Sequence, residues 1–274
     1  MNNFILFNNK FKLNIISHEL DNPKAILINI HGFGMHFQSE DEYLRTLEAR
    51  IESFNPLKIL SYGLELRGHG KSDGLKFHIH DYNDYLSDIY ALVLHIREKY
   101  DLPIYLLGES IGGALAIIYS IKYKDISGVI LLGPMIDIVE SINGLLINAI
   151  FLISYIVPRW KIIKPSNNIM KEYKKSKCVY TSCEPVMLCS GRECYKIIKW
   201  IKANKDKFTL PVLAIHSIDD RITSHKATKD FIDNCESTDK TFISLPGNKH
   251  SLLLGNDIDK VLNIIYSWFN KRIL

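Results

Sequence analysis

The sequence predicts an α/β protein: a mostly parallel, eight-stranded sheet flanked by helices, with one helical insertion. Three observations predict this class. Apolar, β-branched runs recur along the chain, most of them are continuous rather than alternating, and helical patterns separate them. Continuous apolar runs are typical of strands covered on both faces, and strand–helix alternation is typical of a parallel sheet. With 274 residues, of which 47% are hydrophobic, the chain can bury one large core.

Eight runs are the expected strands. The first two, joined by a short Asn-Asn-Lys turn, predict an antiparallel hairpin at the sheet edge. From residue 25 onward the runs are nearly continuous, so we expect the later strands to be buried on both faces. The eight runs are residues 4–8, 11–16, 25–31, 58–64, 103–109, 128–133, 211–217 and 241–245.

Four helices are expected between and after these strands, at 41–54, 84–100, 111–123 and 259–269. The alternation stops between Gly133 and Phe208, where the sequence is helical, basic and rich in cysteine, with no convincing strand. Connections within compact α/β units are normally about 2–6 residues, so this stretch predicts an insertion. We therefore expect core residues 1–134, a helical cap or lid at 135–208, and core residues 209–274.

Composition limits the function classes. A net charge of +4 is too small to indicate nucleic-acid binding. The N-terminal stretch lacks the pattern of a signal peptide, so we expect a cytoplasmic protein with reduced cysteines. Four of the five cysteines lie between Cys178 and Cys194 without CxxC spacing, and packing in the cap is the favoured interpretation. His78 and His80 have HxH spacing but no evident third metal ligand.

One serine stands out, Ser110 in Gly108-Glu109-Ser110-Ile111-Gly112. The motif follows a predicted strand and precedes a predicted helix. A G-x-S-x-G sequence there forms a sharp turn that exposes the serine oxygen as a nucleophile. The alternative is a tight turn in which the serine only caps the helix.

A nucleophilic serine needs a base and an orienting carboxylate, in this fold type in the order Ser, acid, His. His250, in a loop between the last strand and the final helix, is a better candidate than His225, which is expected in the first turn of a helix. Asp219 and Asp220 follow the strand at 211–217. Loops after parallel strands meet at one sheet edge, so these groups can meet Ser110.

The oxyanion of an acyl-transfer reaction also needs hydrogen-bond donors. One is expected to be the amide of Ile111, directly after the nucleophile. The other is expected in the loop after the strand at 25–31, which reads His31-Gly32-Phe33-Gly34-Met35-His36. Taken by itself, this loop could also be an ordinary glycine turn.

These segments together resemble the α/β-hydrolases of the monoacylglycerol lipase and lysophospholipase group. The motifs are HGFG (31–34), LRGHGKSDG (66–74), GESIGG (108–113), SIDDRIT (217–223) and GNKHSLL (247–253), and CEPVMLCSGRE (183–193) is similar to the group's late cap segment. The resemblance implies the α/β-hydrolase fold and neither a metal nor an organic cofactor. It implies a catalytic Ser110, Asp220 and His250, oxyanion amides from Phe33 and Ile111, and a substrate site at His31, Gly32, Gly34 and Glu109. Glu109 departs from the animal lipases, which carry histidine there, and this weakens the transfer of substrate preference from them.

The expected activity is hydrolysis of a lipid ester, a monoacylglycerol or a lysophospholipid, through an acyl-enzyme. A broad short-chain esterase, a thioesterase and an idle lipid-binding homologue remain alternatives. The apolar run 141–158, short for a membrane span, precedes the basic stretch 159–177. This predicts cap contact with an anionic membrane through Lys171, Lys174 and Lys175. Alternatively, the cap packs on the core and its lysines are merely solvated. The oligomeric state stays open.

Overall fold

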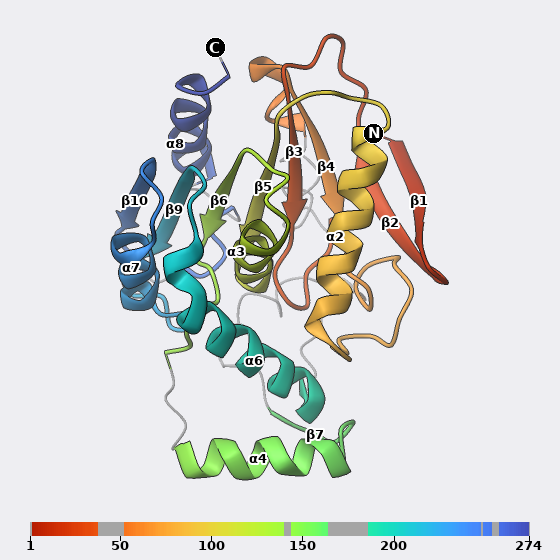
Figure 1. The fold of residues 1–274 in the computed structure, drawn as a ribbon, viewed down its shortest axis with the longest axis vertical. Helices are drawn as coiled ribbons and strands as arrows, with labels where there is room; N and C mark the ends of the chain where they lie inside the picture. Colours follow the sequence, from red (N-terminus) through yellow and green to blue (C-terminus); the bar gives the residue numbers. More distant parts are fainter. Residues whose placement is uncertain are drawn as a thin grey trace.

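The computed structural model describes residues 2–37, 52–139, 144–163, 186–247, 249–253 and 258–273. Its main sheet has eight strands in the order β1-β2-β4-β3-β5-β6-β9-β10 (Figure 1). The strands are β1 (Asn2–Asn8), β2 (Phe11–Ser17), β3 (Ala25–Ile30), β4 (Ile59–Leu64), β5 (Ile104–Glu109), β6 (Gly128–Leu132), β9 (Val212–Ser217) and β10 (Lys240–Leu245).

The strand pairing confirms the predicted class. All neighbours from β4 to β10 pair in parallel, whereas β1 pairs with β2, and β2 with β4, in antiparallel fashion. The edge hairpin is therefore also confirmed. Strands β3, β4, β5, β6 and β9 are buried at every residue. Strand β10 is the exception, because it is the other edge of the sheet and most of its residues are partly exposed.

Helices cover both faces of the sheet. Successive residues of each strand point to opposite faces, so the sheet has one apolar core on each side. Ile26 and Ile28 of β3 belong to the core with α2 (Tyr82–Arg97) and α3 (Ile111–Tyr123). Leu27 points the other way, into the core formed with α8 (Ile258–Asn270). Burial of each such side chain contributes about 1.5–3 kcal/mol. The predicted helices after residue 84, at 111–123 and near the C-terminus are confirmed, whereas most of the one expected at 41–54 lies outside the described residues.

The chain between β6 and β9 leaves the main sheet. Its helices α4 (Gly144–Ile156) and α6 (Leu188–Asn204) lie beyond the ends to which the arrows of β3 and β10 point (Figure 1). Helix α6 inserts Ile197 and Ile201 into the core with α2 and α3, and α4 packs on α6. Arg192 of α6 joins the two helices, donating to the Ser154 carbonyl at 3.2 Å.

One expectation for this stretch is wrong, because it contains two strands. The pair β7 (Lys161–Ile163) and β8 (Val186–Met187) forms a small antiparallel sheet. Strands of three and two residues are too short to give a detectable periodicity in the sequence. Within the described ranges, no helix has the length and apolarity needed to cross a membrane.

Helix α7 (His225–Asn234) follows β9 and begins at His225, as expected for this histidine. Its N-cap is Ser224, whose hydroxyl oxygen accepts a hydrogen bond from the Ala227 amide at 3.2 Å. A serine at this position satisfies one of the free amides of a helix start. The cap thereby fixes where α7 leaves the carboxyl edge of the sheet, close to the loop that carries Asp220.

Candidate active site

Ser110 occupies the turn between β5, which ends at Glu109, and α3, which begins at Ile111. Its φ of 54° and ψ of −117° lie outside the favoured regions for a residue with a side chain, and such a conformation costs about 1–3 kcal/mol. The Ser110 side chain makes no capping hydrogen bond to the helix. The structure therefore does not support the capping alternative, and the strained turn matches the conformation of an exposed nucleophile.

The two glycines of the motif make this turn possible. A Cβ on Gly112 would lie 2.3 Å from the carbonyl oxygen of Ile30 in β3. A Cβ on Gly108 would lie 2.4 Å from the carbonyl oxygen of Gly112. These neighbours are backbone atoms that cannot move aside. Glycine is therefore required at both positions to let α3 start close to β5 and β3.

The loop after β3 lies against the nucleophile. A Cβ built on Gly32 would be 3.4 Å from the Ser110 Cβ. The buried His31 ring fixes the start of this loop: its Nε2 accepts a hydrogen bond from the Leu66 amide at 3.1 Å, so the neutral ring carries its proton on Nδ1 and donates to the Gly32 carbonyl at 2.7 Å. This arrangement holds Phe33, the expected oxyanion donor, in a loop beside Ser110.

A carboxylate that the sequence analysis missed anchors the same loop. Glu65 is fully buried and accepts hydrogen bonds from the Phe37 amide at 3.1 Å and the Lys71 amide at 2.7 Å. Asn14 of β2 donates to it at 2.9 Å. Glu65 therefore ties the end of the 31–37 loop to the 65–74 loop. Its position directly before the LRGHGKSDG motif is the only signal in the sequence.

The expected acid and base form a hydrogen bond with each other. Asp220 follows β9, His250 follows β10, and His250 Nδ1 lies 2.8 Å from Asp220 Oδ2. The alternatives make other contacts: His225 forms a hydrogen bond with the Ser244 hydroxyl at 2.8 Å, and Asp219 is exposed. Because Nδ1 donates to the carboxylate, Nε2 of neutral His250 keeps the lone pair that a base requires.

Electrostatics favour the ionised form of Asp220. Burial by itself raises the pKa of this carboxyl group, but hydrogen bonds from His216 and His250, the charge of His250 and the Ile222 amide lower it further than burial raises it. The net pKa is well below the ordinary value for aspartate. Asp220 is therefore a carboxylate at neutral pH and can stabilise a positively charged imidazole.

A short segment at the end of β6 brings the two halves of the site together. The Ser110 amide donates to the Leu132 carbonyl at 3.0 Å, and the Met135 amide donates to the Ser110 carbonyl at 2.9 Å. Between them, a Cβ on Gly133 would be 3.5 Å from Asp220 Oδ2 and 3.6 Å from His250 Nδ1. Ser110 and the Asp220–His250 pair thus flank the same three residues at the carboxyl edge of the sheet.

The other expected site residues also lie at this edge. Glu109, the last residue of β5, is buried, and Gly34 has a φ of 79° that favours glycine. Both ring nitrogens of His31 are bonded to backbone groups, which indicates a role in shaping the loop. Two groups around Asp220 were missed, His216 and Thr223. Thr223 is the last residue of the SIDDRIT motif, whereas His216 lies just before it.

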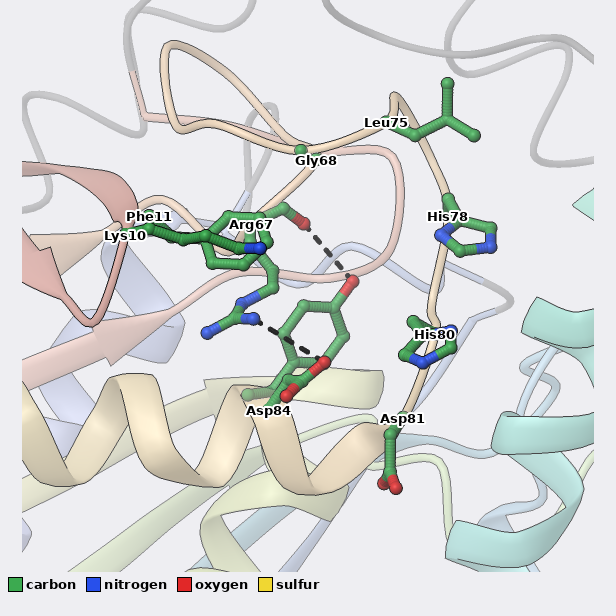
Figure 2. Close-up of a pocket in the computed structure, with 11 residues that line it drawn as sticks. Lys10, Phe11, Arg67, Gly68, Leu75, His78, His80, Asp81 and Asp84 are labelled. Atoms are coloured by element: carbon green, nitrogen blue, oxygen red, sulfur yellow. Dashed lines mark hydrogen bonds and ion pairs between the residues drawn. The ribbon is translucent and has the colours of Figure 1, made fainter.

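A separate cavity of about 420 Å³ lies near the turn of the β1–β2 hairpin (Figure 2). Arg67 is its best-held group: its guanidinium lies 4.2 Å from the centroid of the Phe11 ring and forms two hydrogen bonds to Asp88, at 2.8 and 2.6 Å. His78 and His80 stack with ring centroids 6.1 Å apart. None of Ser110, Asp220 and His250 lines it. The lining residues are Lys10, Phe11, Arg67, Gly68, Gly74, Leu75, His78, His80, Asp81, Asp84 and Tyr85.

Comparison with known proteins gives consistent matches over nearly the whole chain. The sequence model of the family described as serine aminopeptidase S33 matches residues 21–258. Monoglyceride lipase of Mus musculus is 27% identical over 262 residues, which cover 92% of this chain and 84% of the relative. Caffeoylshikimate esterase of Arabidopsis thaliana is 24% identical over 91% of this chain and 79% of its own length. The solved structure of a soluble variant of monoglyceride lipase from Saccharomyces cerevisiae shares the fold, with a TM-score of 0.79 and 22% identity over 98% of this chain and 94% of that one.

Proposed function

The chain belongs to the α/β-hydrolase family described as serine aminopeptidase S33, and from this membership we propose that it hydrolyses lipid esters. It is a carboxylic-ester hydrolase. Its proposed substrates are lipid esters, most specifically a monoacylglycerol or a lysophospholipid. The single observation that carries the proposal is the bonded pair Asp220–His250 beside a strained, uncapped Ser110.

The proposed reaction is acyl transfer through an acyl-enzyme. His250 Nε2 accepts the proton of Ser110 as the serine oxygen attacks the ester carbonyl, and Asp220 stabilises the resulting imidazolium. The amides of Phe33 and Ile111 donate to the tetrahedral oxyanion. His250 then protonates the leaving alcohol, and water attacks the acyl-enzyme with His250 again as the base, releasing the acid and regenerating Ser110.

The proposed cap, 135–208, lies within the stretch between the end of β6 at Leu132 and the start of β9 at Val212. Helix α4 supports the proposed contact of this cap with an anionic membrane. Ile156 is 81% exposed and Leu152 67%, and Trp160, just beyond the helix and directly after Arg159, is 56% exposed. Exposed apolar residues beside cations suit the interface of an anionic bilayer. The lysines on which the sequence prediction depended, at 171, 174 and 175, lie outside the described residues.

A broad-specificity esterase is the second candidate, because the relatives include an esterase of a non-lipid ester, caffeoylshikimate esterase. The two candidates differ in chain-length dependence. A lipid esterase should prefer long-chain monoacylglycerols or lysophospholipids, and its rate should rise when the substrate forms an interface. A broad esterase should prefer short-chain, soluble esters.

Labelling and hydrolysis together test the proposal. The wild-type protein should react with a fluorophosphonate probe and hydrolyse members of a panel of monoacylglycerols, lysophospholipids, thioesters and short-chain esters. Ser110→Ala should abolish both, with a loss of turnover of about 10⁶. Ser267→Ala, which removes an exposed hydroxyl from α8, is the matched control and should keep both. An unlabelled wild type, or a labelled Ser110→Ala, would rule out Ser110 as the nucleophile.

A further inference from the structure

The carboxylate of Asp220 forms hydrogen bonds with two histidines. Its Oδ1 accepts hydrogen bonds from the backbone amides of Ile222 at 2.8 Å and Thr223 at 3.2 Å. Its Oδ2 lies 2.8 Å from His250 Nδ1 and also 3.1 Å from His216 Nε2. The mechanism above uses the first histidine and leaves the second without a role.

The partners of His216 fix the orientation of its ring. Nε2 faces Asp220 Oδ2 and, at 3.3 Å, the carbonyl oxygen of Thr223. Both are acceptors, so Nε2 carries a hydrogen and donates it. Nδ1 lies 2.9 Å from the hydroxyl of Thr228 on α7, a group that can donate or accept a hydrogen bond. The fully buried ring is therefore held at both nitrogens.

We propose that His216 is a positioning residue for the acid–base pair: its Nε2–H holds Asp220 Oδ2 in the orientation that the His250 imidazole requires. The inference rests on the proposed function of Asp220 and His250. A carboxylate can rotate about its last bond, and the amides at Oδ1 hold one oxygen only. The His216 bond from β9 and the Thr223 hydroxyl, which lies 3.0 Å from Oδ2, hold the other oxygen, so the oxygen that faces His250 is fixed before substrate binds.

This bond also sets how much negative charge Oδ2 presents to His250. A donor on a carboxylate oxygen spreads its charge, so loss of the His216 bond leaves more charge facing the imidazole. His250 should then hold a proton up to higher pH, and a protonated His250 cannot act as the base. His225 also packs against His216, with ring centroids 5.7 Å apart, and Asp219 and Lys229 act electrostatically on His225. His225 is therefore the control position for general charge effects.

Three variants test the proposal on a soluble ester. His216→Leu removes the donor, His216→Gln keeps an amide donor near the Nε2 position, and Thr228→Val releases the other nitrogen of the ring. We expect His216→Leu to lower kcat about 10–100-fold, as loss of an outer hydrogen bond to a catalytic group does, with KM little changed. In the pH profile of kcat/KM, His216→Leu should move the acid limb, where activity falls at low pH, to higher pH. His216→Gln should recover most of the activity. Thr228→Val should move the limb less, and His225→Gln should not move it.

The outcomes separate positioning from packing. If His216→Leu keeps the wild-type kcat and acid limb, the proposal is wrong. If His216→Leu does not fold, His216→Gln and Thr228→Val decide: an acid limb at the wild-type pH in Thr228→Val, or inactivity in a folded His216→Gln, rejects the role.

A spectroscopic test does not depend on turnover. Histidine-labelled wild-type protein should show two low-field imidazole N–H resonances, from His216 Nε2–H and His250 Nδ1–H. His225→Gln should leave both in place, whereas Thr228→Val should shift the His216 resonance. Thr228→Val should shift the His250 resonance together with that of His216. If it leaves the His250 resonance in place, the inference is wrong even if ester hydrolysis is confirmed. Failure of ester hydrolysis with both resonances present would reject the proposed function instead.

Discussion

The two halves of the candidate site are built by different physical means. Ser110 is positioned by the backbone: a strained turn, glycines at 108 and 112, and close approach of β3 and β5 to α3. Asp220 and His250 are positioned by side-chain hydrogen bonds from loops that follow β9 and β10. The difference teaches what each half tolerates. The backbone half rejects any added atom, whereas the hydrogen-bonded half accepts similar shapes but depends on donors and acceptors.

Within the hydrogen-bonded half, the largest expected effect comes from changing Asp220. Asp220→Asn keeps the shape but replaces an acceptor with a donor facing His250, so His250 can no longer hold the required proton on Nδ1. We expect kcat for a soluble ester to fall about 10⁴-fold. Asp219→Asn is the matched control and should keep most activity. Comparable losses in the two variants would contradict the assignment of the acid.

The backbone half should respond in stability. Gly112→Ala places a Cβ 2.3 Å from the Ile30 carbonyl oxygen, and we expect a loss of about 3 kcal/mol in the free energy of unfolding, as for severe overpacking. Gly247→Ala is the control, since a Cβ there meets no atom within 4 Å and only the φ of 108° is unfavourable. Urea unfolding measures both. An equal cost in the two variants would show that backbone strain, not crowding, governs this half.

A buried histidine beside the backbone half should make stability depend on pH. Burial lowers the pKa of His69 to about 4, so the unfolded chain binds a proton there more readily than the folded one. The stabilisation is full above about pH 6.5 and is lost as the pH falls towards 4, with about 2 kcal/mol lost between pH 7 and pH 5.

The variant His69→Phe should remove this part of the pH dependence. Urea unfolding at pH 7 and pH 5 measures it, and Phe77→Leu is the control, because it disturbs the same ring contact without removing a titrating group. A pH dependence identical to that of the wild type in His69→Phe would assign the effect to other groups.

The smallest expected change in the free energy of unfolding comes from α4, which lies outside both halves of the site. Ile156→Ser removes an exposed apolar side chain from α4, so the free energy of unfolding should change by no more than about 0.5 kcal/mol. Ile201→Ala, at a buried position of α6, should cost about 2–5 kcal/mol. Sedimentation with phosphatidylglycerol vesicles should show weaker binding for Ile156→Ser. Unchanged binding would remove α4 from the proposed membrane contact.

The fold class, the edge hairpin and the order of the site segments could all be predicted from the amino-acid sequence. Hydrophobic periodicity and glycine spacing are local properties, so they can be seen without coordinates. The Gly108–Gly112 motif predicted the turn at Ser110 for the same reason.

The contacts between side chains could be seen only in the folded protein. It brought Asp220 and His250 to 2.8 Å, separated His225 from them, and revealed Glu65 and His216. It also placed β7 and β8 in the insertion. Such contacts join residues far apart in the chain, and a buried polar side chain finds its partner through the packing of whole strands, which no local pattern records.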